Sequence, residues 1–202
     1  ELLNPPTKPR HYHAVAILTK DGRVWAAGGG LCGDDCVSNH PDAETLTPPY
    51  LMGDDGITPL PASARPVIDD TPDVIRTTDV TIVVTMNVDE DCKFALVRLG
   101  AVTHSTNTDA RRIPLEVLSR SVFEVTLSIP SNENILLPGE YWLFAMNEAG
   151  VPSIGESVTV PPPTTFSTPV VAQLRAEVLS GECVDMLSSD DSTILIQQPC
   201  SA

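Results

Sequence analysis

The chain has 202 residues, and its hydrophobic share of 42% is ordinary for a globular protein with a buried core. Its 27 acidic residues outnumber its 12 basic residues, and the formal net charge of -15 argues against nucleic acid and anionic membrane surfaces as partners. No run of residues approaches the roughly 18 consecutive apolar positions that a membrane-spanning helix requires. Because the chain begins at Glu1, we expect that a leader or an upstream domain has been removed.

Short runs rich in Val, Ile and Thr, separated by Gly, Pro, Asn and Asp, predict an all-β fold. The first two runs are His11–Leu18 and Val24–Ala27. Between them lies Lys20–Arg23, whose Asp-Gly pair readily adopts the positive φ angles of a tight turn, so these residues are predicted to form a hairpin. Two strands of this size cannot bury a core alone.

Residues 48–160 contain about seven further strands, the number expected of an immunoglobulin-like β-sandwich. Alternate residues of these strands should form the core, with Trp142 and Phe144 among the larger contributors. The predicted strands are Arg65–Ile68, Val80–Met86, Phe94–Leu99, Arg111–Leu118, Val122–Ile129, Tyr141–Met146 and Ser157–Val160.

The last part of the chain has a different composition. Residues 161–170 are rich in proline, which favours extended polyproline geometry and indicates a semi-rigid linker. Residues 171–202 are too few to fold as an independent domain.

Five cysteines are present, and four of them form a close pair, Cys32 and Cys36, and a more widely spaced pair, Cys183 and Cys200. Both pairs are interpreted as disulfides formed in an oxidising compartment. Cys32 and Cys36 would also suit zinc as two thiolate ligands, but no second pair lies nearby to complete such a site. The remaining cysteine, Cys92, is expected to be a small packing residue rather than a reactive thiol.

Three short segments carry the chemistry: Arg10–His13, Gly28–Cys36 and Thr103–Arg112. Taken alone, a Tyr-His pair is usually a surface pair, a Thr-His pair usually contains a loop histidine, and the glycines of Gly28–Cys36 suit either a phosphate site or close backbone packing. No helix or lysine follows these glycines, which favours packing. Neighbouring side chains on a regular strand point to opposite faces, so Tyr12 and His13 can bind one metal only where the strand ends or bends.

In this order and spacing, the three segments resemble the C-terminal part of the galactose oxidase family of copper radical oxidases. The resemblance covers residues 9–160. It implies that residues 1–47 are the last strands of a Kelch-type seven-bladed β-propeller, and that residues 48–160 are an immunoglobulin-like early-set domain. The resemblance continues through Asn39–Ala43, Thr47–Leu51, Leu137–Trp142 and Ala149–Ser153.

The same resemblance implies a copper ion bound by Tyr12, His13 and His104, a donor set of phenolate oxygen and imidazole nitrogens that suits Cu(II). The fourth ligand, a tyrosine joined to a cysteine by a thioether, belongs to the missing N-terminal part and stores the second electron as a radical. Tyr12 would be the catalytic base that takes the hydroxyl proton of a primary alcohol or carbohydrate, because coordination makes a phenol easier to deprotonate. Dioxygen would be reduced to hydrogen peroxide.

Around these donors, Asp109, Arg111 and Arg112 are expected to hold the His104 loop by charge-assisted hydrogen bonds. The alternative is a solvated ion-pair cluster. His11 is expected to point away from the metal. His40 is interpreted as a structural residue.

The resemblance further implies a secreted, extracellular protein that acts as a monomer. The residues after His104 resemble galactose oxidase more than the glyoxal oxidase branch, which favours primary alcohols over aldehydes. Residues 171–202 resemble the start of a ricin-type β-trefoil lectin module, or else form a disulfide-pinned hairpin. The alternative function is that of a non-catalytic carbohydrate-binding propeller and sandwich protein, which would lack the upstream cysteine and tyrosine.

Overall fold

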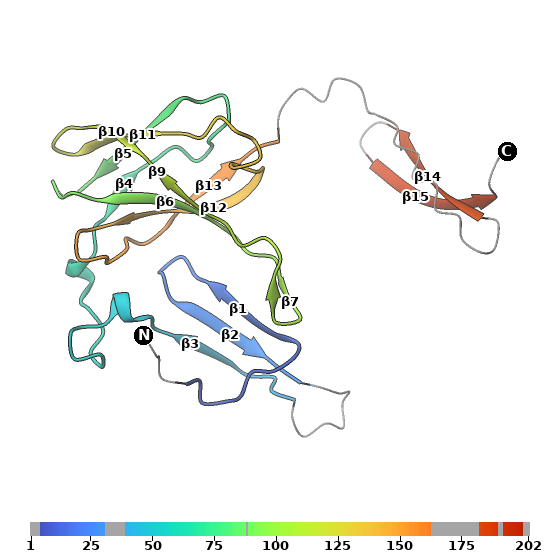
Figure 1. Cartoon of the computed structure of the whole chain (residues 1–202), viewed down its shortest axis with the longest axis horizontal. Helices are drawn as coiled ribbons and strands as arrows, with labels where there is room; N and C mark the ends of the chain where they lie inside the picture. The colour runs from blue at the N-terminus through green and yellow to red at the C-terminus, as the bar shows by residue number, and fades with distance from the viewer. Residues whose placement is uncertain (1–4, 31–38, 88, 163–181, 190–191, 200–202) are drawn as a thin grey trace. The chain divides into compact units, whose positions relative to one another are not determined.

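The computed structural model describes residues 5–30, 39–87, 89–162, 182–189 and 192–199, the last two ranges as backbone only. The chain divides into two units, Glu1–Pro163 and Thr164–Ala202, which are described separately. In Figure 1 the first unit contains a β-sandwich and, below it, a smaller sheet made of β1, β2 and β3. The predicted all-β fold is confirmed for these residues.

The sandwich consists of two antiparallel four-stranded sheets, in the orders β10-β11-β5-β4 and β13-β12-β6-β9. The predicted sandwich is therefore confirmed, with small shifts of the strand ends. Its strands are β4 (Ile68–Asp70), β5 (Thr81–Met86), β6 (Lys93–Arg98), β9 (Arg112–Leu115), β10 (Val117–Arg120), β11 (Glu124–Ser128), β12 (Gly139–Met146) and β13 (Glu156–Val160).

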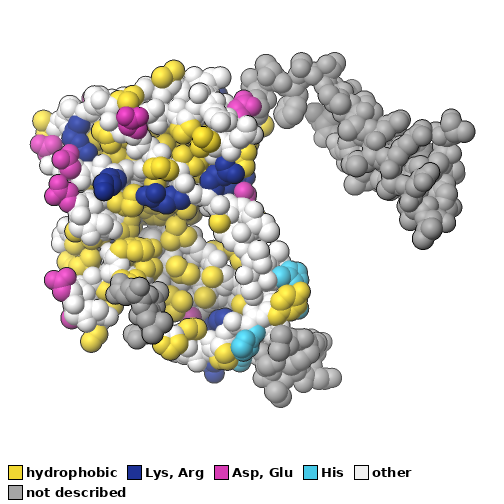
Figure 2. Space-filling model, viewed as in Figure 1, with side chains coloured by type: hydrophobic (Ala, Val, Ile, Leu, Met, Phe, Trp, Pro, Cys, Tyr) yellow, Lys and Arg dark blue, Asp and Glu magenta, His cyan; other side chains and the backbone are white. Residues whose placement is uncertain are grey.

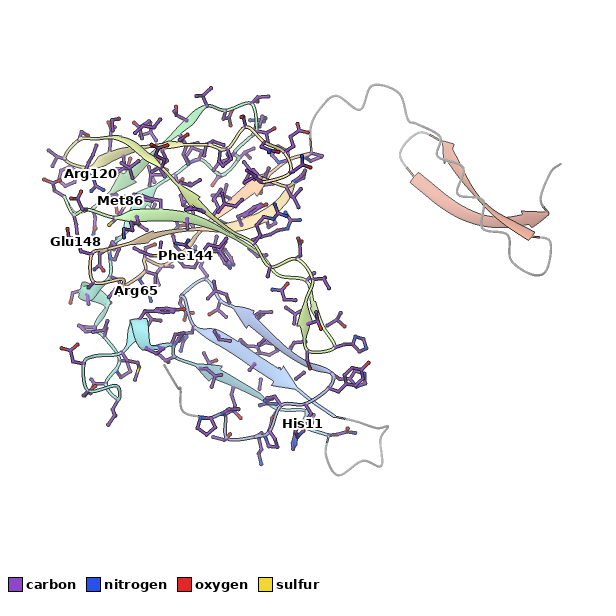
Figure 3. All side chains as sticks on the ribbon, in the orientation of Figure 1. His11, Arg65, Met86, Arg120, Phe144 and Glu148 are labelled. Atoms are coloured by element: carbon purple, nitrogen blue, oxygen red, sulfur yellow. The ribbon has the colours of Figure 1, made fainter. Side chains whose placement is uncertain are left out.

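The core between the two sheets comes from alternate residues, as expected of a half-buried strand. On β12 these residues are Tyr141, Leu143 and Ala145, all of which belong to the buried cluster. The prediction that Trp142 and Phe144 fill this core was wrong, because both alternate sets of β12 are apolar and these two residues lie on the opposite face. Phe144 is nevertheless buried, on the side of the sandwich that faces β1 and β2 in Figure 3.

Two of the predicted strands differ in detail. Arg111–Leu118 was expected to be one strand, but the chain passes from one sheet to the other at Glu116, so β9 pairs with β6 whereas β10 pairs with β11. β4 begins at Ile68, which leaves Arg65 outside the strand, free to bond elsewhere. Cys92 is buried, and burial raises the pKa of its thiol to about 11, which agrees with a packing role.

The small sheet contains the predicted hairpin, β1 (Ala14–Leu18) and β2 (Val24–Gly28), together with β3 (Ala43–Leu46), which was not predicted. The turn between β1 and β2 places Gly22 at a φ of 79°, the conformation for which the Asp-Gly pair is suited. Two short 3₁₀ turns, η1 (Pro49–Leu51) and η2 (Ala62–Ala64), lead from β3 to the sandwich.

Arg65 connects the small sheet to the sandwich (Figure 3). Its guanidinium group donates to the carbonyl oxygens of Pro152 and Ser153, at 2.8 and 2.6 Å, and to that of Asp21 at 2.9 Å. The hydroxyl of Tyr50 donates to the carbonyl of Gly22 at 2.7 Å, which adds a second link to the same turn. The end of the hairpin is therefore anchored to the sandwich.

A second connection is a small hairpin, β7 (Val102–Thr103) and β8 (Thr106–Asn107), which extends from the sandwich toward β1 (Figure 1). This hairpin was not predicted as strands. It carries His104 in its turn, so it positions one of the three expected metal ligands.

The second unit contains one antiparallel pair, β14 (Glu182–Ser189) and β15 (Ser192–Pro199). The two expected disulfides, Cys32 with Cys36 and Cys183 with Cys200, lie outside the residues whose side chains are described. Within the described residues, no helix is long and apolar enough to cross a membrane.

Candidate metal site

Tyr12 and His13 lie just before β1, where the backbone bends. His13 has a φ of 65°, a left-handed conformation that is uncommon for residues with a side chain, and β1 starts at the next residue, Ala14. The amide of Ala14 donates to the carbonyl of His11 at 3.1 Å, which closes the turn. The bend required for Tyr12 and His13 to approach one point is therefore present.

Arg10 fixes the chain that enters this turn. Its side chain is 9% exposed and donates to the carbonyl of Gly28 at 2.9 Å. It also forms ion pairs with Asp42 and Glu44, at 2.6 and 3.2 Å. Because charge-assisted hydrogen bonds are stronger than neutral ones, the donors that follow Arg10 are attached firmly to the ends of β2 and β3.

Gly28 and Gly29 allow the turn to lie close to β2. Their φ angles are 68° and 120°, and a Cβ atom on them would lie 3.1 Å from the carbonyl oxygen of His13 and 3.3 Å from the amide nitrogen of His11, respectively. A side chain at either position would push this turn away from β2. The interpretation of these glycines as close backbone packing is confirmed.

His104 lies in the two-residue turn between β7 and β8, since Thr103 pairs directly with Thr106. His104 and Ser105 both have positive φ, 51° and 62°, which is the backbone of a type I′ hairpin turn. Such turns usually contain Asn-Gly, so a His-Ser pair departs from the local preference. Departures of this kind concentrate at functional sites.

Hydrogen bonds orient His104 and join its turn to β1. The hydroxyl of Thr103 lies 2.7 Å from Nδ1 of His104, which leaves Nε2 as the atom that faces outward from this contact. The amide of Ser105 donates to the carbonyl of Ala14 at 2.9 Å, and its hydroxyl donates to the carbonyl of His11 at 2.8 Å. The turn that carries His104 is thus bonded to the turn that carries Tyr12 and His13.

As a result, three rings from two distant parts of the sequence lie together. The ring centroids are 4.1 Å apart for Tyr12 and His13, 5.3 Å for Tyr12 and His104, and 4.9 Å for His13 and His104. Two imidazoles and a phenol are donors that suit Cu(II), so the residues present fit a copper ion. Among the described residues, no group of three or more His, Cys, Asp or Glu could hold a metal ion, and the donor set described here includes the phenol of Tyr12.

The three donors lie on an open edge of the unit. Tyr12 is 51% exposed, and His13 and His104 are also exposed. Two grooves of about 280 and 310 Å³ lie elsewhere, where the small sheet meets the sandwich, and are lined by Leu18, Val97 and Arg112 among others. Figure 2 shows apolar side chains gathered there beneath a row of Lys and Arg side chains. The donors are together, and they are not among the residues that line these two grooves.

The three residues expected to support the His104 loop have different partners. Asp109 forms an ion pair of 2.6 Å with Arg98 of β6, and Arg98 also donates to the carbonyl of Pro138 at 2.7 Å. Asp109 therefore ties the end of the loop to the sandwich. Sequence reasoning missed Arg98, whose role depends on Asp109 folding back onto β6.

Arg111 and Arg112 bond away from the loop. Arg111 donates to the carbonyls of Asn134 and Ile135, at 2.7 Å each, and Arg112 lies 3.9 Å from the sulfur of Met146. Their contacts support the sandwich, and a role at His104 stays a prediction. The backbone amide of His40 donates to the carbonyl of Gly29, and the carbonyl of His11 accepts from the hydroxyl of Ser105. The backbone of both histidines therefore forms hydrogen bonds that hold the segments around Tyr12 and His13.

Comparison with known proteins identifies a known domain in the part of the chain that forms the sandwich. Residues 65–160 match the family model described as the galactose oxidase-like early set domain. Among curated proteins, galactose oxidase from Gibberella zeae is 40% identical over 158 residues, which cover 78% of this chain and 22% of that protein. An aldehyde oxidase GLOX from Vitis pseudoreticulata is 32% identical over 173 residues, or 79% of this chain and 32% of that protein.

A solved structure is also similar. A fungal alcohol oxidase of the AA5 family, determined in complex with copper, is 41% identical and superposes with a TM-score of 0.71 over 79% of this chain and 33% of that one. This chain therefore spans between about a fifth and a third of the length of the relatives it matches.

Proposed function

We propose that the chain is the C-terminal part of a copper radical oxidase of the galactose oxidase type, because residues 65–160 match the galactose oxidase-like early set domain and the similarity to galactose oxidase extends over most of the chain. The longer protein oxidises the primary alcohol group of a galactose-type sugar or a small alcohol to an aldehyde and reduces O₂ to hydrogen peroxide. The observation that supports this proposal is the convergence of Tyr12, His13 and His104 from two distant segments. The presence of all three donors favours this proposal over a non-catalytic binding protein, which would lack the upstream cysteine and tyrosine.

The small sheet supports the proposal that residues 1–47 belong to a Kelch-type propeller. In its register Ile17 pairs with Trp25 on one face, and Leu18 pairs with Val24 on the other. Ile17 and Trp25 are 38% and 36% exposed, so this face of the hairpin leaves two adjacent large apolar side chains partly uncovered. A hairpin with apolar residues on both faces suits a propeller blade, which packs between two neighbouring blades.

Each donor has a distinct role in this proposal. His13 and His104 bind copper through imidazole nitrogens, and the phenolate oxygen of Tyr12 accepts the proton of the substrate hydroxyl. When bound, copper supplies a one-electron acceptor and a Lewis acid beside these residues. A tyrosine–cysteine thioether cofactor, which is expected in the upstream part of the longer protein, would supply the acceptor for the second electron.

The substrate class follows from the relatives. Identity is higher to a galactose oxidase, at 40%, than to the aldehyde oxidase of the grapevine, at 32%, which favours alcohols over aldehydes.

We assign the protein to the extracellular space, where Cys32–Cys36 and Cys183–Cys200 disulfides would persist, and expect a monomer. Residues 171–202 stay assigned as the start of a lectin-like module or as a hairpin extension; the β14–β15 pair suits both.

The test is peroxide release by the copper-loaded longer protein with galactose and a panel of primary alcohols. Tyr12→Phe and His104→Ala should each lower kcat/KM by at least about a hundredfold, because they remove the base and a metal ligand. Tyr50→Phe is the matched control, since it removes a phenol that lies at the β1–β2 turn instead. A copper-replete protein that releases no peroxide with any of these substrates would overturn the oxidase assignment.

A further inference from the structure

We infer that Ser105 is a positioning residue that sets the separation of His13 and His104. This inference rests on the proposed function, because it concerns how the same three donors are brought to one copper ion. Ser105 itself is not a ligand in this account. It acts through the two turns that carry the ligands.

The backbone of the His104 turn needs external support. His104 and Ser105 are consecutive residues at positive φ, 51° and 62°. For residues with a side chain, such a conformation is unfavourable and persists only where surrounding contacts enforce it. The turn is also exposed, so packing contributes little to its conformation.

The contacts of Ser105 supply this support. Its amide donates to the carbonyl of Ala14 at 2.9 Å, and its hydroxyl donates to the carbonyl of His11 at 2.8 Å. The two acceptors lie immediately before and immediately after the pair Tyr12 and His13. One residue therefore connects the β7–β8 turn to the chain on both sides of the other two donors.

Removal of the hydroxyl should loosen this connection without abolishing it. The turn would keep the main-chain bond to Ala14 but lose the bond to His11, so it would pivot about a single point. The 4.9 Å separation of the His13 and His104 rings would then vary, and fewer molecules would present both imidazoles to one metal. Loss of a residue that orients a metal ligand typically costs a factor of about 10–100 in metal affinity.

The experiment measures Cu(II) dissociation constants and pulsed EPR spectra of the 202-residue chain. Ser105→Gly removes the hydroxyl while glycine adopts positive φ without strain, so the chain should fold normally. Ser105→Ala removes the hydroxyl and keeps the strain. Both variants should bind Cu(II) at least about tenfold more weakly, with one coordinated imidazole instead of two.

Thr106→Ala is the matched control, because the hydroxyl of Thr106 stays within the same hairpin, 3.4 Å from the carbonyl of His104. It should leave the copper affinity and spectrum unchanged. A glycine variant that binds Cu(II) within twofold of the unmodified chain with both imidazoles would overturn the role of Ser105, and so would an equal loss in Thr106→Ala. An unmodified chain without a specific Cu(II) site would instead overturn the proposed function.

Discussion

Asp21 shows how one carboxylate stabilises the turn that anchors the small sheet. It lies between β1 and β2 and forms an ion pair with Arg23 at 2.6 Å. Partial burial by itself would raise the pKa of Asp21, but hydrogen bonds from Arg23 and Thr19 outweigh burial and lower the pKa to about 2. Because the carboxylate is favoured in the folded state, its stabilising contribution is present above about pH 4 and is lost as the pH falls toward 2.

Asp21→Asn should therefore destabilise the chain by about 1 kcal/mol at pH 7, a value kept small because the ion pair is partly exposed to solvent. The amide keeps most of the hydrogen-bonding geometry, so the difference reports the charge. Urea unfolding at pH 7, 4 and 2 should show the gap closing at the lowest pH. Asp54→Asn is the control at an exposed position, and a gap that persists at pH 2 would contradict the assignment.

At the scale of elements, the small sheet and the sandwich are joined through Arg65. Its guanidinium group donates to the carbonyls of Asp21, Pro152 and Ser153 at 2.6–2.9 Å. Lysine keeps the charge but cannot reach three carbonyls from one planar group. Arg65→Lys should therefore destabilise the first unit by about 3 kcal/mol, the value of one or two hydrogen bonds to a charged group.

Chemical denaturation followed by circular dichroism measures this loss, with Arg76→Lys, at an exposed position, as the matched control. The control should change the free energy of unfolding by no more than about 0.5 kcal/mol. Equal effects of the two substitutions would show that Arg65 does not join the two elements.

Which elements could be predicted from the sequence depended on the range of the interactions that form them. The β1–β2 hairpin was predictable because the Asp-Gly turn is local. The passage between β9 and β10 at Glu116 was not, because an unbroken strand pattern does not show which sheet each half joins. On β12 both faces are apolar, so alternation could not decide that Tyr141, rather than Trp142, enters the core.

In the candidate site, too, some residues could be named from the sequence and others could not. Tyr12, His13 and His104 were named from motifs, and they lie together in the structure. Ser105 and Arg98 could not be found, because their partners are a backbone carbonyl and a carboxylate whose positions only the fold defines. The His-Ser pair becomes recognisable as a departure from Asn-Gly only once the structure shows that a tight turn lies there.

At the scale of the whole molecule, the chain brings three donors to an open edge and leaves apolar side chains of the β1–β2 hairpin exposed to solvent. Tyr12 is 51% exposed, and the β1–β2 hairpin carries apolar residues on both faces. The matching part of this chain covers only 22–33% of the length of the relatives. We therefore expect the 202-residue chain to bind copper but to release no peroxide, because the proposed function assigns the substrate pocket and the second electron carrier to a longer protein.

The claim that Tyr12, His13 and His104 form one metal site is tested by the number of imidazoles bound to Cu(II) in the 202-residue chain, measured by pulsed EPR. We expect two imidazoles in the unmodified chain and one in each of His13→Ala and His104→Ala. His11→Ala should keep two, because His11 contributes its backbone carbonyl to the site. The same count in all four proteins, or the absence of a specific Cu(II) signal, would contradict the claim that these residues form one metal site.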